Sequence, residues 1–275
     1  MKKGLLISLF ALLALLTFTA CGALSAPEEA SGPIEAVPLE LEESTDDAAV
    51  EAADTEADMA EEEYTEEAPV VEEMAEEAVE DATEDVVEEA AETESTTGLV
   101  VYSIVPGEST VRFELDEDLR GNRITVVGQT DQVAGELAVD FANLANTQVG
   151  TIQINARTLV TDNDFRNRAI QNKILVTGEN EFVTFAPTAV NGMPDSIAIG
   201  DTIEFTIDGD LTVAGTTNPA TFEITATAVS AEQITGTAST IITRESFGLT
   251  IPSVPNVANV EEEVELYIDF IANAQ

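Results

Sequence analysis

From Leu99 to the end of the chain, polar and apolar residues alternate with a period of two. In the run TIEFTIDGDLTV, Ile203, Phe205 and Ile207 fall on one face, whereas Thr202 and Glu204 fall on the other. Successive side chains of a strand point to opposite faces of a sheet, so this run has the pattern of a long, half-buried strand. The same alternation gives one apolar face to each of these sets: Val111, Phe113 and Leu115; Val133, Leu137, Val139 and Phe141; Ile152, Ile154 and Ala156; Phe222, Ile224 and Ala226; Ile234, Ala238 and Ile242; Val264, Leu266, Ile268 and Phe270.

These strands predict an all-β fold for residues 99–275, which form one domain. Glycine-containing turns such as NGMPDS and VAGTTNP separate several strands, which favours antiparallel neighbours. So many strands with one apolar face need a second sheet or closure of the sheet on itself, and closure also removes exposed edges. We therefore expect an extended antiparallel β-barrel of about eight strands. Only residues 161–175, TDNDFRNRAIQNKIL, break the period; their opening Thr and Asp suit a helix N-cap, so we expect a short helix there.

The chain begins with the pattern of an export signal. Lys2 and Lys3 precede the apolar run GLLISLFALLALLTF, and small residues lead to Cys21, the only cysteine. The residues FTACG resemble a bacterial lipobox, in which the cysteine is acylated and becomes the new N-terminus, although Phe18 stands where an aliphatic residue is usual. We expect residues 1–20 to be a lipoprotein signal peptide and Cys21 to anchor the protein on the extracytoplasmic side of a cell-envelope membrane. The alternative is an ordinary signal peptide with an incidental cysteine.

A strongly acidic stretch separates this start from the domain. Residues 27–98 contain 29 of the 54 acidic residues and no lysine or arginine. Their alanines and glutamates favour helix, but glutamates spaced four apart repel one another. We therefore expect residues 21–98 to be the acylated cysteine followed by a mainly disordered stalk that acts as a spacer, in preference to a cation-binding tract or a coiled-coil helix. Nucleic acid is excluded as a partner, because the chain has no basic patch to displace counterions.

Several sequence blocks carry a family resemblance. YSIVPGESTVRFEL, INARTLVTDNDFRNRAIQNKIL with EFVTFAPTAV, DGDLTVAGTTNPATFEI, and RESFGL with EEEVELYIDF occur in the order of the signature blocks of the YceI-like family and cover nearly all of residues 99–275. The resemblance implies a lipocalin-like barrel, secreted or periplasmic, that holds a polyisoprenoid or similar long apolar lipid in its lumen. The family often has Asp-x-His-Leu where this chain has DFRNRAI, and the chain has no histidine, so a contact through that histidine cannot be carried over.

Small residues on the inward face favour a hollow barrel. Ala220, Ala226, Ala228, Gly236 and Ala238 share the face of large apolar residues and leave space beside them. We expect a lumen lined by these residues: Phe113, Phe205, Ile207, Phe222, Ile224, Ala226, Ile268 and Phe270. The alternative is that the small residues taper one end of the barrel and the phenylalanines are ordinary core.

Catalysis finds little support in the sequence. Without histidine or a Gly-x-Ser-x-Gly elbow, the usual pairs of nucleophile and base cannot be assembled, so we expect no catalytic residue and no cofactor. The pairs Asp162 with Asp164 and Asp208 with Asp210 lack the glycine and distal glutamate of an EF-hand, so no metal site is expected. These acids are interpreted as surface residues and an N-cap.

Arg244 is the charge of most interest, because it lies before the loop IPSVPNVAN in a domain with few arginines. It would either contact a ligand headgroup at the mouth of the barrel or pair with Glu245 or a neighbouring acid.

Two classes of function follow. The first is a lipid-anchored binding protein for an isoprenoid or other long-chain lipid. The second is a non-enzymatic surface or structural lipoprotein with a solid barrel. The sequence makes no prediction of the ligand's identity or of the oligomeric state.

Overall fold

The computed structural model of the protein describes residues 26–41 and 98–275. Cys21, the predicted signal peptide and residues 42–97 of the predicted stalk lie outside the described residues. The elements in chain order are β1 (Val100–Ile104), β2 (Thr110–Leu119), β3 (Asn122–Thr130), β4 (Val133–Ala134), β5 (Glu136–Val139), the 3-10 turn η1 (Leu144–Asn146), β6 (Gln148–Val149), β7 (Ile152–Asn155), the 3-10 turn η2 (Ala156–Thr158), α1 (Asp164–Ala169), the π-helical turn η3 (Ile170–Ile174), β8 (Phe182–Asn191), β9 (Thr202–Val213), β10 (Thr216–Ser230), β11 (Gln233–Thr243), β12 (Val257–Ala258) and β13 (Glu263–Ala274).

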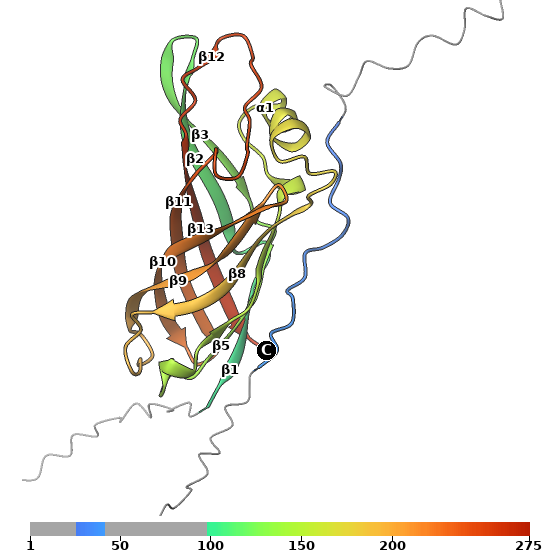
Figure 1. Ribbon diagram of the computed structural model, residues 1–275. Helices are drawn as coiled ribbons and strands as arrows, with labels where there is room; N and C mark the ends of the chain where they lie inside the picture. Colours follow the sequence, from blue (N-terminus) through green and yellow to red (C-terminus); the bar gives the residue numbers. More distant parts are fainter. Residues whose placement is uncertain (1–25, 42–97) are drawn as a thin grey trace, which may run out of the picture. The chain divides into compact units, whose positions relative to one another are not determined.

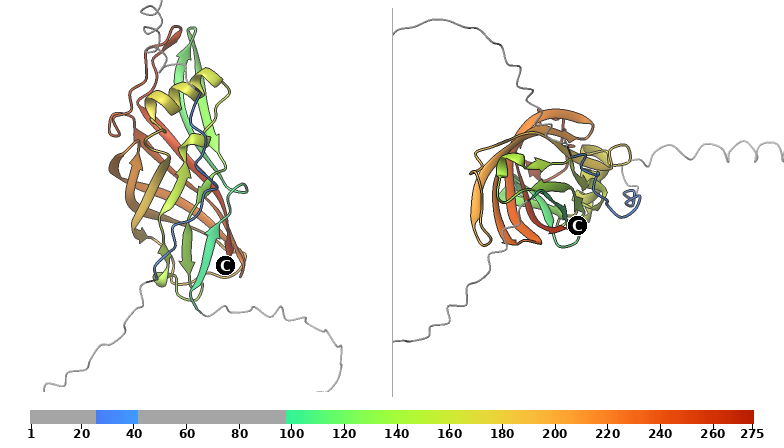
Figure 2. Two further views of the ribbon diagram at one scale, coloured as in Figure 1. Left: turned by 90° about the vertical axis from the view of Figure 1, so that its right-hand side faces the viewer. Right: turned by 90° about the horizontal axis from the view of Figure 1, so that it is seen from below.

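The strands form one antiparallel sheet that curls strongly around its own axis (Figures 1 and 2). The strand order is β4-β7-β8-β9-β10-β11-β13-β1-β5-β6. Its two ends meet, because β4 continues along the chain into β5, β6 continues into β7, and the two segments pair with each other. The long strand β13 pairs with β1 near its end and with β2 earlier, so the β2–β3 hairpin extends the sheet beyond β1. The predicted all-β fold is confirmed as a curled antiparallel sheet with one short helix.

The face of β10 that the alternation predicts to point inward is the buried one. In β10, Phe222, Ile224 and Ala226 are buried and Glu223 between them is exposed. The register puts Phe222 opposite Ile207 and Ala226 opposite Ile203, so apolar side chains of neighbouring strands meet inside the sheet. The inner face of the sheet is therefore the core of the domain.

The helix is shorter than predicted and begins later. Its N-cap is Asn163, whose Oδ1 accepts hydrogen bonds from the backbone N–H of Phe165 at 2.9 Å and of Arg166 at 3.2 Å. The expected cap at Thr161 or Asp162 is wrong, because the Asn167 side chain accepts from Thr161 instead and Asp162 pairs with Arg166. Asparagine and aspartate cap helices about equally well, so local preference did not select between them.

Residues 26–41, which composition assigns to the stalk, lie against the outside of the domain; we call them the strap. The strap runs without strand pairing from the α1 end toward β5 (Figures 1 and 2). Ile34 is buried, and the backbone N–H of Leu39 donates to Oε2 of Glu136 in β5 at 2.7 Å. Pro27, Pro33 and Pro38 favour an extended backbone in this segment.

Glu181 holds the beginning of the strap. Its Oε1 accepts hydrogen bonds from the backbone N–H and the hydroxyl of Ser31 at 2.8 and 3.0 Å and from the amide of Asn155 at 2.9 Å. Its Oε2 lies 3.0 Å from Arg157, which also pairs with Glu28 of the strap. Burial alone would raise the pKa of Glu181, but the hydrogen bonds from Ser31 and Asn155 and the charge of Arg157 lower that pKa below its usual value.

We expect Glu181→Gln to weaken the strap. A neutral amide keeps one acceptor but turns N–H groups toward Arg157, so the free energy of unfolding at pH 7 should fall by about 1–2 kcal/mol. Because the folded state lowers this pKa, the carboxylate stabilises the fold above the usual glutamate pKa, and that stabilisation is lost as the pH falls through the lowered value. Urea unfolding at pH 7 and at pH 3 checks this.

The matched control is Glu179→Gln, because Glu179 is exposed and its side chain has no hydrogen bond or ion pair within the described residues. It should leave both the stability and its acid dependence unchanged. Equal stability of Glu181→Gln and the unsubstituted protein at pH 7 would contradict the role given to Glu181.

Candidate functional site

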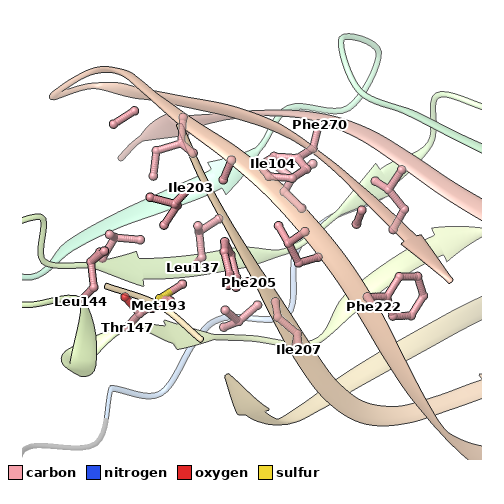
Figure 3. Close-up of a pocket in the computed structure, with 18 of the residues that line it drawn as sticks. Ile104, Leu137, Leu144, Thr147, Met193, Ile203, Phe205, Ile207, Phe222 and Phe270 are labelled. Carbon is pink, nitrogen blue, oxygen red and sulfur yellow. The ribbon is translucent and has the colours of Figure 1, made fainter. Parts of the chain in front are cut away.

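Two cavities lie inside the curled sheet. The larger, about 410 Å³, lies at the α1 end and is lined by β2, α1, η3 and the loop between β11 and β13; we call it the α1 cavity. The smaller, about 120 Å³, lies toward η1 and the loop between β8 and β9, and we call it the distal cavity (Figure 3). The backbone N–H of Leu144 donates to the carbonyl of Asp195, and that of Ile197 to the carbonyl of Phe141, which fixes this loop beside η1.

An aromatic pair separates the two cavities. Phe185, Phe222 and Ile268 lie in the walls of both. The rings of Phe185 and Phe222 meet edge to face, with centroids 4.7 Å apart and an interplanar angle of 64°. Both residues are buried. We call Phe185 and Phe222 the partition.

All eight residues predicted to line the lumen lie on cavity walls. Phe113 lines the α1 cavity, and Phe222 and Ile268 line both. The distal cavity is lined by the other five, Phe205, Ile207, Ile224, Ala226 and Phe270. The structure brings these side chains from four strands, β2, β9, β10 and β13, onto the apolar walls of the two cavities; their contact with a ligand stays a prediction.

Only some of the small inward residues leave space. Ala226, Ala228 and Ala238 line the distal cavity. Gly236 does not, because the ring of Phe270 lies over it: a Cβ on Gly236 would come within 2.7 Å of Phe270 Cζ. The expectation that Gly236 opens the lumen is therefore wrong, and the glycine instead makes room for an aromatic ring on the neighbouring strand.

The same arrangement recurs at Phe113, whose ring lies where a Cβ on Gly128 would be. It also recurs at Phe185, whose ring lies over Gly209. Three of the lumen phenylalanines are thus positioned by glycines on adjacent strands.

The α1 cavity contains an ion pair that the sequence analysis missed. Glu117 follows Val111, Phe113 and Leu115 on the inward face of β2, where an apolar residue would continue the pattern. It is 7% exposed, and Oε1 lies 3.1 Å from Nη2 of Arg166 on α1. A buried carboxylate is tolerated when it is paired, and the helix supplies that partner. A charged residue at an inward position of the alternation was the available signal.

Arg244 also lines the α1 cavity, at the end of β11. Its Nε donates to the carbonyl of Glu261 at 2.7 Å, and its Nη2 lies 2.8 Å from the carboxylate of Glu262. The predicted pairing with a neighbouring acid is thus with Glu262, while the backbone N–H of Glu245 donates to that same carboxylate. Arg244 holds the loop between β11 and β13 in place, and its contact with a headgroup stays a prediction.

The wall of the distal cavity is apolar apart from Thr147. The Thr147 hydroxyl is buried and has no hydrogen-bond partner within the described residues. Figure 3 places it beside Leu144 and Met193. Thr147 thus supplies the one side-chain hydroxyl in the wall of this cavity.

The predicted acid pairs are surface groups. Asp208 accepts hydrogen bonds from Asn191 at 2.9 Å and from Thr221 at 2.5 Å on the outside of the sheet.

Across residues 26–41 and 98–275, no group of three or more acidic, histidine or cysteine side chains is arranged to hold a metal ion. In the same ranges, every helix is too short and too polar to cross a lipid bilayer.

Two solved structures share this fold. A polyisoprenoid binding domain from Saccharophagus degradans implicated in plant cell wall breakdown superposes with a TM-score of 0.52 at 14% identity, covering 64% of this chain and 99% of that one. BcnA of Burkholderia cenocepacia superposes with a TM-score of 0.50 at 17% identity, covering 62% of this chain and 99% of its own.

No curated protein matches the sequence. The YceI-like domain, however, matches residues 102–272, which is more than half of the chain and includes both cavities. The chain belongs to the YceI-like family.

Proposed function

We propose that this protein is a lipid-anchored, extracytoplasmic binding protein that holds a long apolar lipid of the polyisoprenoid class in its lumen. The observation that carries the proposal is the pair of adjoining cavities inside the sheet, about 410 and 120 Å³, walled almost entirely by apolar side chains. A solid barrel would not leave this space. The fold relative described as polyisoprenoid binding supports the class of ligand.

The walls suit a hydrocarbon chain. Each Å² of apolar surface removed from water contributes about 25 cal/mol to the free energy of binding. The wall of the distal cavity has no charged side chain, so a charged ligand group that lost its water there would find no partner. An isoprenoid tail that enters the distal cavity therefore gains free energy from burial alone. Because no reacting group is needed for this, the proposed role is non-enzymatic.

The polar end of such a lipid belongs in the α1 cavity. Arg166 and Arg244 both lie in its wall, each already paired with a carboxylate. A guanidinium can donate to a further oxygen while it keeps its first partner, since it carries five N–H groups. We propose that the tail occupies the distal cavity and that the headgroup stays near these arginines.

The anchor would be diacylglycerol on Cys21, after removal of residues 1–20. Acyl chains of this kind hold a domain at a membrane through about 0.8 kcal/mol for each buried CH₂.

We expect Ala226→Phe to reduce bound lipid while the domain still folds. The new ring would fill part of the distal cavity that the ligand otherwise occupies. Mass spectrometry of lipid extracted from the purified protein measures the loss, and thermal unfolding of the delipidated protein should show near-normal stability.

Thr225→Phe is the matched control, because Thr225 lies on the opposite face of β10, and it should leave the lipid content unchanged. If Ala226 lay in a filled core, overpacking would cost about 1–3 kcal/mol. Such a loss of stability, together with no extractable lipid in the unsubstituted protein, would overturn the binding proposal.

The partition should control the length of chain that binds. Phe222→Leu removes ring atoms from between the two cavities, so we expect the bound lipids to shift toward longer isoprenoid chains, at a cost in stability of about 1 kcal/mol. The measurement is the chain-length distribution after incubation with a mixture of prenols. Phe247→Leu is the control, since Phe247 is buried but lines neither cavity. An unchanged distribution in Phe222→Leu would contradict the partition's role.

Cys21→Ser tests the anchor. The variant should remain unprocessed by the lipoprotein peptidase or be released in soluble form, because serine cannot carry the thioether-linked lipid. Membrane fractionation and the intact mass of the mature protein report this. An unchanged mass and unchanged fractionation would show that Cys21 is not the anchor.

A further inference from the structure

We propose that the α1 end of the domain docks on the bilayer surface, so that the α1 cavity faces the lipid from which its ligand comes. This inference rests on the proposed lipid anchor and goes beyond it, because an anchor alone sets neither the distance nor the orientation of the domain.

The strap determines where the anchored end of the chain meets the domain. Glu28 pairs with Arg157 at 3.0 Å, and Arg157 Nη1 donates to the carbonyl of Glu29. Arg157 lies beside the helix, because Gln171 of η3 donates its side-chain amide to the carbonyls of Arg157 and Leu159 at 3.1 and 3.0 Å. The strap therefore begins at the α1 end (Figure 1).

The chain between the anchor and this point is short. Five residues lead from Cys21 to Ala26. A fully extended chain covers at most about 3.6 Å per residue, which gives a tether of at most about 18 Å. The acidic segment does not lengthen this tether, since residues 42–97 follow the strap in the chain.

The described residues that flank that segment lie at the other end of the domain. Leu39 is bonded to Glu136 of β5. Val100, the first residue of β1, pairs with Val139 of the same β5. Figures 1 and 2 show this end of the strap and the start of β1 far from α1. The anchor thus holds the α1 end near the membrane.

The α1 end has an apolar surface suited to a bilayer. Phe165, in the first turn of α1, lines the α1 cavity and is 73% exposed. Val254, in the loop across the cavity, is 42% exposed and lines it as well. The guanidinium of Arg168 lies 5.8 Å from the centre of the Phe165 ring, and an aromatic ring next to a cation is typical of residues at the headgroup level.

Single-tryptophan variants test the docking directly, because the chain contains no tryptophan. Phe165→Trp places the probe at the α1 end, and Ile199→Trp, at a residue that is 45% exposed in the loop between β8 and β9, is the matched control at the distal end. The full mature protein, with its acylation verified by intact mass, is inserted into phosphatidylcholine vesicles with or without brominated acyl chains. We expect the brominated lipid to remove most of the fluorescence of Phe165→Trp and none of that of Ile199→Trp.

The outcomes separate docking from the anchor. An acylated protein in which Phe165→Trp is not quenched, or in which Ile199→Trp is quenched equally, would overturn docking and leave lipid anchoring and lipid binding standing. A mature protein without acyl chains would overturn the anchor and the tether together. Lipid extracted from the same preparation reports separately on the lumen.

Discussion

The hydrogen bonds that join β1 to β5 and β7 to β8 close the sheet on itself, and the other features of the domain depend on this closure. Inside a closed sheet, a buried polar side chain without a partner is costly, so most inward side chains are apolar. The period-two pattern supplies the apolar residues, and Glu117, the charged exception in β2, is paired with Arg166. Large inward rings also need space, which glycines on neighbouring strands provide for Phe113, Phe185 and Phe270.

The fold could be predicted from the sequence where local pattern determines it. Alternation decides which face of a strand is buried, so the inward face of β10 could be predicted from the sequence. The glycine-containing turn between β9 and β10 likewise predicted their antiparallel pairing. The strap could not be predicted, because the composition of the acidic stretch as a whole does not distinguish a short segment with three prolines and a buried isoleucine. Its attachment depends on Arg157 and Glu181, which are far away in the chain, and no local pattern links them to Ser31.

The candidate site could likewise be predicted only in part. The eight lumen residues could be predicted because they are the inward members of alternating strands. Whether Gly236 leaves space in the lumen depends on the residue opposite it on the neighbouring strand. The pairing of β11 with β13 puts Phe270 opposite Gly236, and the Phe270 ring fills that space. Phe185 and Arg166 were missed for a similar reason: the partition and the ion pair join elements that meet only in the folded sheet.

The position of the strap also determines where the flanks of the acidic segment join the domain. Residues 42–97 carry 25 acidic side chains and no basic one. A polyanion repels anionic headgroups strongly only within a Debye length, which is about 8 Å at physiological salt. Both flanks of the segment join the domain beside β5, whereas the proposed anchor joins it at the α1 end. Repulsion between this segment and an anionic membrane would therefore favour the orientation in which the α1 end meets the bilayer. If Cys21 is the anchor, the acidic segment would contribute to the orientation of the domain, because residues 42–97 follow the strap in the chain and do not lie between Cys21 and the domain.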